Sequence, residues 1–348
     1  MTRDTRDGHE LLAPIQALHG RIRDGVVAET ERAALDVLAG VHADGDGDTI
    51  YAIDKIAEDV LVDGVDRAIA QEHGPVVLVA EGLAGGRVVL PAGADEGAAR
   101  WTIVVDPIDG TRGLMYQKRP AWILTGVAPR RPGAAGPGGL DDIVLAVQTE
   151  IPLVKQHLSD QLWAMAGAGA AGERADRLTG ERRALPLRPS AAATLAHGFA
   201  TVARFFPGIR TELAALDDEV AAALLGPPVP GKAQLFEDQY ICTGGQLYEL
   251  IVGHDRFVAD LRSVARPAAD RAGRWSLARA LCCHPYDLCT ELIARECGVI
   301  VTDERGARLA APLDVEPNVS WIGYANARLQ GVVAPVLDAA LRARGWIA

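Results

Sequence analysis

The sequence predicts a mixed α/β protein, because short apolar runs with strand character alternate with segments of helical spacing along the chain. The clearest strands are the β-branched runs at 76–80 and 101–105, and the clearest helix covers 51–70, where apolar residues recur every three to four positions. A chain of 348 residues is too long for one ordinary domain. We therefore expect two subdomains, 1–189 and 190–348.

The other elements follow from the same two periodicities and from turn residues. Gly-Ala-Gly-Ala-Ala-Gly at 167–172 is interpreted as a hairpin turn, and Gly298 suits the end of a helix because it accepts a left-handed backbone. Segments 129–142 and 262–275 are interpreted as insertions near the substrate mouth. In chain order we expect helices at 8–41, 211–225, 244–252, 287–297 and 330–342, and strands at 88–91, 121–128, 143–149, 162–166, 183–187, 198–206, 256–261, 299–302 and 321–324.

Composition indicates a globular protein of the cytoplasm. Hydrophobic residues make up 49% and charged residues 23%, and every apolar run is interrupted before it reaches the length of a membrane span. The first 14 residues lack the apolar core of a signal peptide. Five cysteines without Cys-x-x-Cys spacing argue against a disulfide framework.

The formal net charge of −11 argues against nucleic acid and anionic membranes as partners. It would also repel a phosphorylated substrate, unless bound cations reverse the local charge. The charge therefore favours a metal site if the substrate is a phosphate.

The densest chemical signal is DPIDGT, at residues 106–111, directly after an apolar strand. Its two carboxylates, Asp106 and Asp109, can point into one pocket with the Ile108 carbonyl between them. Such an all-oxygen ligand set suits Mg²⁺. The amides of Gly110 and Thr111 stand at the start of a short helix, where a phosphate binds well. A turn in which an Asp only caps a helix is the structural alternative.

DPIDGT matches the central motif of the inositol monophosphatase superfamily, which the chain resembles over roughly residues 48–329. Upstream, TIYAIDKIAED at 49–59 is similar to the family's Thr-x-x-Asp-x-x-x-Glu helix, and VLVAEG at 77–82 resembles its strand before Gly-Glu-Glu. Downstream, HPYDLCTELIARECGVIVTDERG at 284–306 resembles the Trp-Asp-x-Ala-Ala-Gly and Glu-Ala-Gly-Gly segments, and YANARL at 324–329 the closing Ala-Asn segment. The resemblance implies a layered α-β-α-β-α sandwich of two subdomains.

At the matching positions, the resemblance implies two or three Mg²⁺ ions and a catalytic water. The ion ligands would be Glu81, Asp106, the Ile108 carbonyl, Asp109 and Asp287. Asp54 would hydrogen-bond Thr111 and, together with Glu81, orient and activate a metal-bound water that attacks phosphorus. The family also implies a homodimer and inhibition by Li⁺.

The sequence departs from the family beside these positions. Gly82 replaces the second Glu of Gly-Glu-Glu, Tyr286 replaces the Trp, and RGLMYQKRPAW follows Thr111, where an Asn and an aromatic are usual. Because none of these positions is a ligand, we expect the chemistry to persist with a changed substrate. Thr243, Gly244 and His284 are the candidate substrate contacts.

We therefore predict a Mg²⁺-dependent phosphomonoesterase acting on a cyclitol, sugar or nucleotide phosphate. The alternatives are a phosphoadenosine phosphate or bisphosphate phosphatase and a catalytically silent metal- or phosphate-binding regulator. Cys283, His284 and Cys289 crowd around Asp287 and raise the possibility of zinc, but we favour a packing role for the cysteines. An EF-hand at 44–48 fails on geometry, and a Rossmann site at 167–172 lacks the helix it needs.

Overall fold

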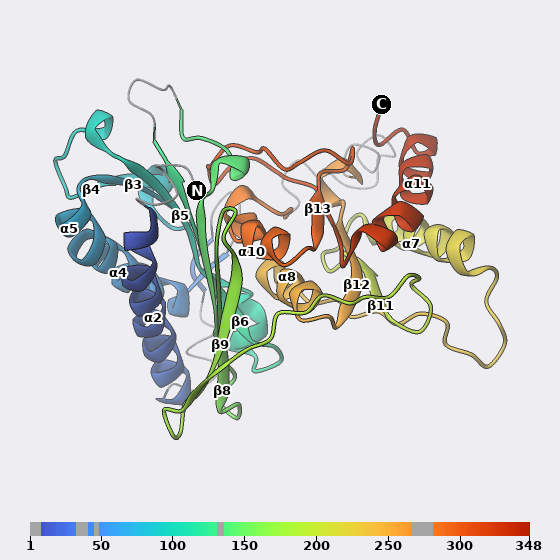
Figure 1. Cartoon of the computed structure of the whole chain (residues 1–348), viewed down its shortest axis with the longest axis horizontal. Helices are drawn as coiled ribbons and strands as arrows, with labels where there is room; N and C mark the ends of the chain where they lie inside the picture. The colour runs from blue at the N-terminus through green and yellow to red at the C-terminus, as the bar shows by residue number, and fades with distance from the viewer. Residues whose placement is uncertain (1–7, 33–40, 45–48, 131–135, 266–280) are drawn as a thin grey trace.

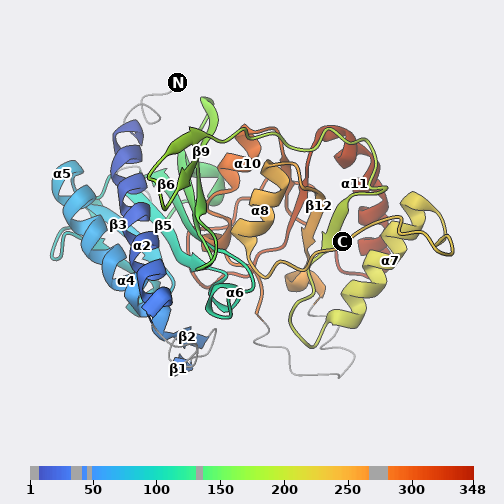
Figure 2. The ribbon, with the colours of Figure 1, turned by 90° about the horizontal axis from the view of Figure 1, so that it is seen from below.

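The protein is built from five layers in the order helix, sheet, helix, sheet, helix (Figures 1 and 2). This computed structural model describes residues 8–32, 41–44, 49–130, 136–265 and 281–348. The layered sandwich that the resemblance implied is confirmed. Residues 45–48 of the segment compared with an EF-hand, most of the second insertion and part of the first lie outside these residues.

The larger sheet has eight strands in the order β10-β9-β8-β7-β6-β5-β3-β4, and all neighbours are antiparallel except β3 and β5. Its inner strands are buried on both faces, which is why they read as continuous apolar runs in the sequence. The strands are β3 (Val76–Ala80), β4 (Arg87–Leu90), β5 (Trp101–Asp109), β6 (Ala121–Pro129), β7 (Leu145–Ile151), β8 (Leu158–Met165), β9 (Gly169–Asp176) and β10 (Arg182–Ala184).

Two long helices cover one face of this sheet. Helix α2 (Leu12–Arg32) contacts β6 and β7, and α4 (Ala52–Val65) contacts β5. Their apolar sides form one core with the facing side chains of the strands. A π-helical stretch (Asp66–Ala70) and α5 (Gln71–His73) extend α4, so the helix predicted at 51–70 is confirmed. Minor elements are η1 (His9–Leu11), β1 (Val41–Asp44) paired with β2 (Thr49–Tyr51), η3 (Ala84–Gly86), η4 (Glu96–Ala98) and η5 (Leu140–Asp142).

The middle layer consists of α8 (Thr243–Ile251), the 3₁₀ turn η6 (Pro285–Leu288) and α10 (Glu291–Glu296). Helix α8 contacts β6 of the larger sheet and β12 of the smaller one, and α10 contacts β7 and β13. The single helix predicted at 287–297 is wrong, because Pro285 opens a separate turn and the backbone of Thr290 leaves helical geometry between the two pieces. Gly298 ends α10 with φ of +89°, as expected.

The smaller sheet has the order β11-β12-β14-β13 and carries two helices on its far side (Figure 1). Its strands are β11 (Phe199–Val202), β12 (Asp255–Asp260), β13 (Ile300–Thr302) and β14 (Trp321–Tyr324), and the helices are α7 (Arg210–Leu225) and α11 (Ala327–Ala343). Asn326 starts α11 by accepting the amides of Arg328 and Leu329. Its own amide donates to the carbonyls of Ser190 and Ala192.

Two sequence expectations about the strands are wrong. Segments 162–166 and 183–187 were predicted to form a hairpin or a pair of edge strands, but β9 lies between them and pairs with both β8 and β10, so only β10 among them is at the edge. Residues 169–172 of the Gly-Ala run at 167–172, interpreted as the hairpin turn, instead form the first half of β9, whose residues are all partly or fully exposed and therefore show no buried apolar pattern. The strand predicted at 198–206 ends at Val202.

The division of the chain at residue 189 stays a prediction. The last strand of the larger sheet ends at Ala184 and the first strand of the smaller sheet starts at Phe199. Among the helices of the described part of the chain, none combines the length and the apolar character needed to span a bilayer.

A buried histidine links helix α2 to the larger sheet. His19 is fully buried, and its two ring nitrogens lie 2.9 Å from the Thr149 hydroxyl and 2.7 Å from the Thr125 hydroxyl. Burial lowers the pKa of His19 from 6.5 to about 3. The folded protein therefore keeps this ring neutral at pH values where the unfolded chain protonates it.

We expect acid to destabilise the wild-type protein through this residue. As pH falls below 6.5, the unfolded state gains a proton that the folded state does not bind, so the free energy of unfolding falls with pH. Between pH 7 and pH 5 this loss is about 2 kcal/mol. Urea unfolding of wild type and His19→Gln at both pH values measures it, because the glutamine can still bond both hydroxyls but does not titrate. Equal pH dependence in the two proteins would contradict the assignment.

Candidate metal and phosphate site

The site lies where β3 and β5 end. These two strands are parallel, with Ala80 opposite Val105, so the residues that follow them leave the sheet at the same edge. Glu81 follows β3 and Asp106 continues β5. The sequence placed these two acids at strand ends, and the parallel pairing brings them together.

A β-bulge puts Asp106 and Asp109 on one side of the sheet. Residues three apart on a regular strand face opposite sides. Here Asp106 pairs with Leu124 and Asp109 with Trp122, so three steps along β5 match two along β6. The extra residue turns the second carboxylate to the side of the first, which is how bulges re-aim side chains.

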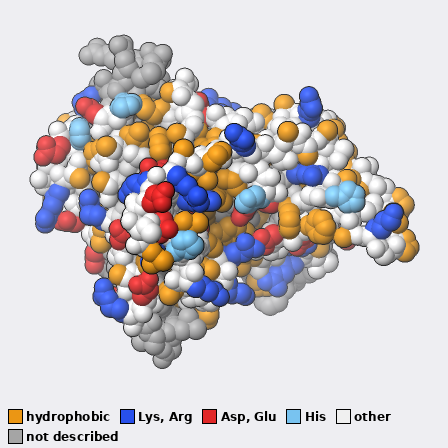
Figure 3. All heavy atoms as spheres, turned by 60° about the horizontal axis from the view of Figure 1, so that its bottom comes forward, with side chains coloured by type: hydrophobic (Ala, Val, Ile, Leu, Met, Phe, Trp, Pro, Cys, Tyr) orange, Lys and Arg blue, Asp and Glu red, His pale blue; other side chains and the backbone are white. Residues whose placement is uncertain are grey.

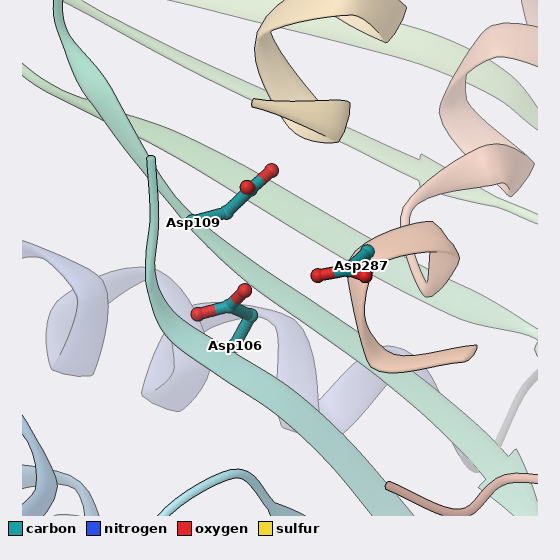
Figure 4. A group of neighbouring side chains, drawn as sticks. All are labelled: Asp106, Asp109 and Asp287. Atoms are coloured by element: carbon teal, nitrogen blue, oxygen red, sulfur yellow. The ribbon is translucent and has the colours of Figure 1, made fainter. Parts of the chain in front are cut away.

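Asp287 completes a group of three carboxylates. It arrives on the turn η6, and one carboxylate oxygen from each of Asp106, Asp109 and Asp287 lies within 4.8 Å of the others. Figure 4 shows the three side chains close together, Asp106 and Asp109 on β5 and Asp287 on η6, with Asp287 directed toward the other two. Asp106 and Asp109 are 4% and 8% exposed, so little water screens their charges.

The pKa of each of the three carboxyl groups is raised above its ordinary value. Burial is the largest cause in each case. The charges of Asp109, Asp287 and Glu81 raise the pKa of Asp106 further, and Asp109 and Glu81 do the same to Asp287. The pKa of Asp109 rises to about 6. Glu81 is not within the 4.8 Å group, but its charge reaches two of the three members.

The start of α8 holds Asp109 in place. The Gly244 amide donates to the Asp109 carboxylate at 2.5 Å, and the Cys242 thiol donates to the Asp109 carbonyl at 3.2 Å. A Cβ at position 244 would lie 2.6 Å from Leu124 and 3.1 Å from the Asp109 carboxylate. Glycine is therefore required for α8 to approach this closely.

Thr111 lies between Asp54 and the DPIDGT loop. Its hydroxyl is 2.8 Å from the Asp54 carboxylate and 2.9 Å from the Ile108 carbonyl. Gly110 has φ of +96° and precedes the short helix α6 (Thr111–Met115), which the sequence predicted. The expected contact between Asp54 and Thr111 is present.

The three candidate substrate contacts lie around the acids but make other contacts as well. The Thr243 hydroxyl is 3.7 Å from the Cys283 thiol, and the Gly244 amide donates a hydrogen bond to the Asp109 carboxylate. The His284 ring stacks on Tyr286, and its Nδ1 is 3.0 Å from the Pro317 carbonyl. The backbone amide of His284 donates to the Asp287 carboxylate at 2.6 Å. Their role toward a substrate stays a prediction.

The donor set distinguishes between metals. Within the described residues, the group of possible ligands contains carboxylates only, although Cys242, Cys283 and Cys289 lie nearby. Burial raises the pKa of these three thiols well above its usual range. Hard oxygen donors without thiolates suit Mg²⁺ better than zinc.

Two contributors were missed in the sequence. Cys242 caps α8 and contacts Asp109, and Gln148 on β7 bonds to Gly244. The available signal for Gln148 was a polar residue in an otherwise apolar strand. Nothing local marked Cys242.

We expect Gly244→Ala to destabilise the protein and to weaken the site. The added methyl overlaps Leu124 and crowds the Asp109 carboxylate, and such overpacking costs about 1–3 kcal/mol. Thermal unfolding measures this loss. Gly331→Ala, in the interior of α11 with open space around it, is the matched control and should be neutral or stabilising. Equal behaviour of the two variants would contradict the close approach of α8.

Comparison with known proteins agrees with this architecture at low sequence identity. No protein-family model matches the sequence, and no curated protein matches it. The structure is similar to Leishmania major fructose-1,6-bisphosphatase in its holo form, with a TM-score of 0.65, 12% identity, and coverage of 97% of this chain and 94% of that one. It is similar to the extragenic suppressor protein SuhB from Bartonella henselae, with a TM-score of 0.61, 15% identity and coverage of 94% and 98%.

A third similar structure is the IMPase of Thermotoga maritima, with a TM-score of 0.57, 16% identity, and coverage of 93% of this chain and 95% of that one. Each similarity extends over nearly the whole of both chains. The chain therefore has the fold of the inositol monophosphatase and fructose-1,6-bisphosphatase structures.

Proposed function

We propose that this protein is a divalent-cation-dependent phosphatase that hydrolyses a small phosphate monoester. The observation that carries the proposal is the buried group of Asp106, Asp109 and Asp287, whose oxygens converge within 4.8 Å. The fold is shared with structures described as a fructose-1,6-bisphosphatase and an IMPase, which supports the same class of chemistry. Fold alone does not determine function, so the argument depends on the residues of the site.

The residues fit a hard divalent cation. Three buried carboxylates with raised pKa values repel one another, and a cation would remove this repulsion. Glu81 adds a fourth carboxylate at the same edge. We assign Glu81, Asp106, Asp109, Asp287 and the Ile108 carbonyl as the residues that would hold two or three Mg²⁺ ions. When bound, Mg²⁺ supplies charge that stabilises the phosphoryl group as it transfers.

The chain supplies groups that can orient the attacking water. Asp54 accepts the Thr111 hydroxyl, which fixes Thr111 beside the acids. We assign Asp54, held by Thr111, and Glu81 to orient the water, and their carboxylates to receive its proton. Figure 3 shows acidic and basic side chains interspersed over the face that it presents.

We assign the amides of Gly110 and Thr111, at the start of α6, to the phosphate. Thr243, Gly244 and His284 are proposed to line the rest of the substrate site. Cyclitol, sugar and nucleotide phosphates all fit this description, and so does an adenosine bisphosphate. A homodimer, Li⁺ inhibition and a cytoplasmic location stay predictions of the resemblance and the composition.

A substrate panel tests the proposal. Purified protein is incubated with inositol phosphates, sugar phosphates and adenosine bisphosphates, with Mg²⁺ or with EDTA, and released phosphate is measured. We expect release with Mg²⁺ only, and the best substrate defines the class. No release from any compound, combined with Mg²⁺ binding, would favour the silent regulator.

We expect Asp109→Asn to lower phosphate release by at least about 100-fold, because it removes charge at the centre of the acid group. The folded structure should persist, since asparagine keeps an acceptor for the Gly244 amide. Circular dichroism checks the fold and phosphate release checks the activity. Asp338→Asn, at an exposed ion pair on α11, is the matched control and should keep full activity. Wild-type turnover in Asp109→Asn would remove the assignment.

We also expect metal removal to lower thermal stability. With EDTA the acid group carries uncompensated repulsion, and a cation that binds only the folded state stabilises it by mass action. Differential scanning calorimetry should show a higher unfolding temperature with Mg²⁺ than with EDTA in wild type. In Asp287→Asn the difference should shrink; an unchanged difference would place the cation elsewhere.

A further inference from the structure

A buried glutamine joins the sheet to both of the segments that complete the acid group. Gln148 lies in the middle of β7 and is 0% exposed. Its Nε2 donates to the Gly244 carbonyl at 2.8 Å, and its Oε1 accepts the Thr290 hydroxyl at 2.9 Å. These partners stand 96 and 142 residues further along the chain.

The two hydrogen bonds require an amide at this position. A carbonyl only accepts, so the Nε2 end of the side chain must face Gly244, and the Oε1 end is left to accept from Thr290. Glutamate could accept from the hydroxyl, but it would place a carboxylate against the Gly244 carbonyl. An apolar side chain would remove both hydrogen bonds from the interior.

Each partner of Gln148 is close to one of the three carboxylates, Gly244 through a hydrogen bond to Asp109 and Thr290 through its position in the chain after Asp287. Gly244 donates its amide to Asp109 at 2.5 Å, so a bond to the carbonyl of the same residue fixes the direction of that donor. Thr290 follows Asp287 by three residues, at the junction of η6 and α10. The bond to Thr290 therefore docks the segment that carries Asp287 onto the sheet.

The register of the sheet puts Gln148 in line with the site. Asp106 is opposite Leu124 on β6, and Leu124 is opposite Gln148 on β7. Residues directly opposite one another share a face of the sheet. Gln148 and Asp106 thus lie on the same face, two strands apart, and the sheet provides the fixed reference from which Gln148 positions the other two acids.

We propose that Gln148 is a positioning residue that sets the placement of Asp109 and Asp287 relative to Asp106, and so sets the affinity of the site for a divalent cation. The proposal rests on the proposed function, because it assigns the cation to this acid group. Residues that orient ligands typically change metal affinity by about 10–100-fold when removed.

The test measures Mg²⁺ binding to the purified full chain by isothermal titration calorimetry, with Mn²⁺ binding by electron paramagnetic resonance as a second readout. Gln148→Met keeps the length of the side chain and removes both hydrogen bonds. We expect its Kd for Mg²⁺ to rise about tenfold or more. We expect kcat to fall and the Mg²⁺ concentration for half-activation to rise, with the substrate KM at saturating Mg²⁺ unchanged.

Three further variants separate positioning from general loss of packing. Thr290→Val removes one of the two bonds and should weaken binding less than Gln148→Met, while Thr290→Ser keeps the hydroxyl and should bind like wild type. Gln161→Met is the control. It removes a partly buried hydrogen bond to the Thr149 hydroxyl, which contacts His19 of helix α2 on the side of the sheet away from the acid group. It should lower the unfolding temperature of the metal-free protein without changing metal affinity.

Wild-type Mg²⁺ affinity in a folded Gln148→Met protein would overturn the proposal. If that variant does not fold, the threonine pair decides, because equal affinities of Thr290→Val and Thr290→Ser would overturn it as well. These results differ from failure of the proposed function, in which wild type itself would release no phosphate, whether or not it binds Mg²⁺.

Discussion

The arrangement of this protein around its site is governed by the cost of holding three like charges together in the interior. Asp106, Asp109 and Asp287 are each partly or fully removed from water, and burial alone raises the pKa of each. The fold offsets part of this cost in the same way three times: each carboxylate accepts a backbone amide, from Ile108 at 3.0 Å, Gly244 at 2.5 Å and His284 at 2.6 Å. These hydrogen bonds do not remove the repulsion between the carboxylates. The negative charge that remains favours a bound cation at this site.

The thin middle layer explains how acids from distant parts of the chain can share one site. Helices α8 and α10 each touch both sheets, so they fix the position of the smaller sheet against the larger one. The start of α8 supplies the donor to Asp109, and the turn before α10 supplies Asp287. Cohesion of the two halves and assembly of the site therefore depend on the same contacts. These contacts are tight. Position 244 has no room for a side chain, and both polar ends of the Gln148 side chain are hydrogen-bonded, one to Gly244 and one to Thr290.

The fold and the acid group tolerate sequence change to different degrees, which is consistent with the low identity to similar structures. A fold is maintained by many interchangeable apolar contacts, so it persists at 12–16% identity over nearly the whole chain. The acid group permits far less change, because a carboxylate that moves or disappears alters the charge and the ligand count directly. The sequence departs from the resemblance beside the acids, at Gly82, Tyr286 and the run after Thr111, at positions that are not themselves members of the acid group.

Local patterns in the sequence were sufficient for most of the elements and for Asp106 and Asp109, whereas Asp287 was identified only through the resemblance. The strand at Val76–Ala80 was predicted with its exact bounds, and DPIDGT predicted two carboxylates after a buried strand. Both predictions succeed because apolar runs and turn residues reflect the local conformation of the chain. The bulge that turns Asp109 toward Asp106, the strand β9, the break before α10 and the bonds of Gln148 were decided only by the tertiary structure. Each of these features depends on a partner strand or on a residue 96 or more positions away. Such contacts do not change the local hydrophobic pattern of either segment, so the sequence pattern could not predict them.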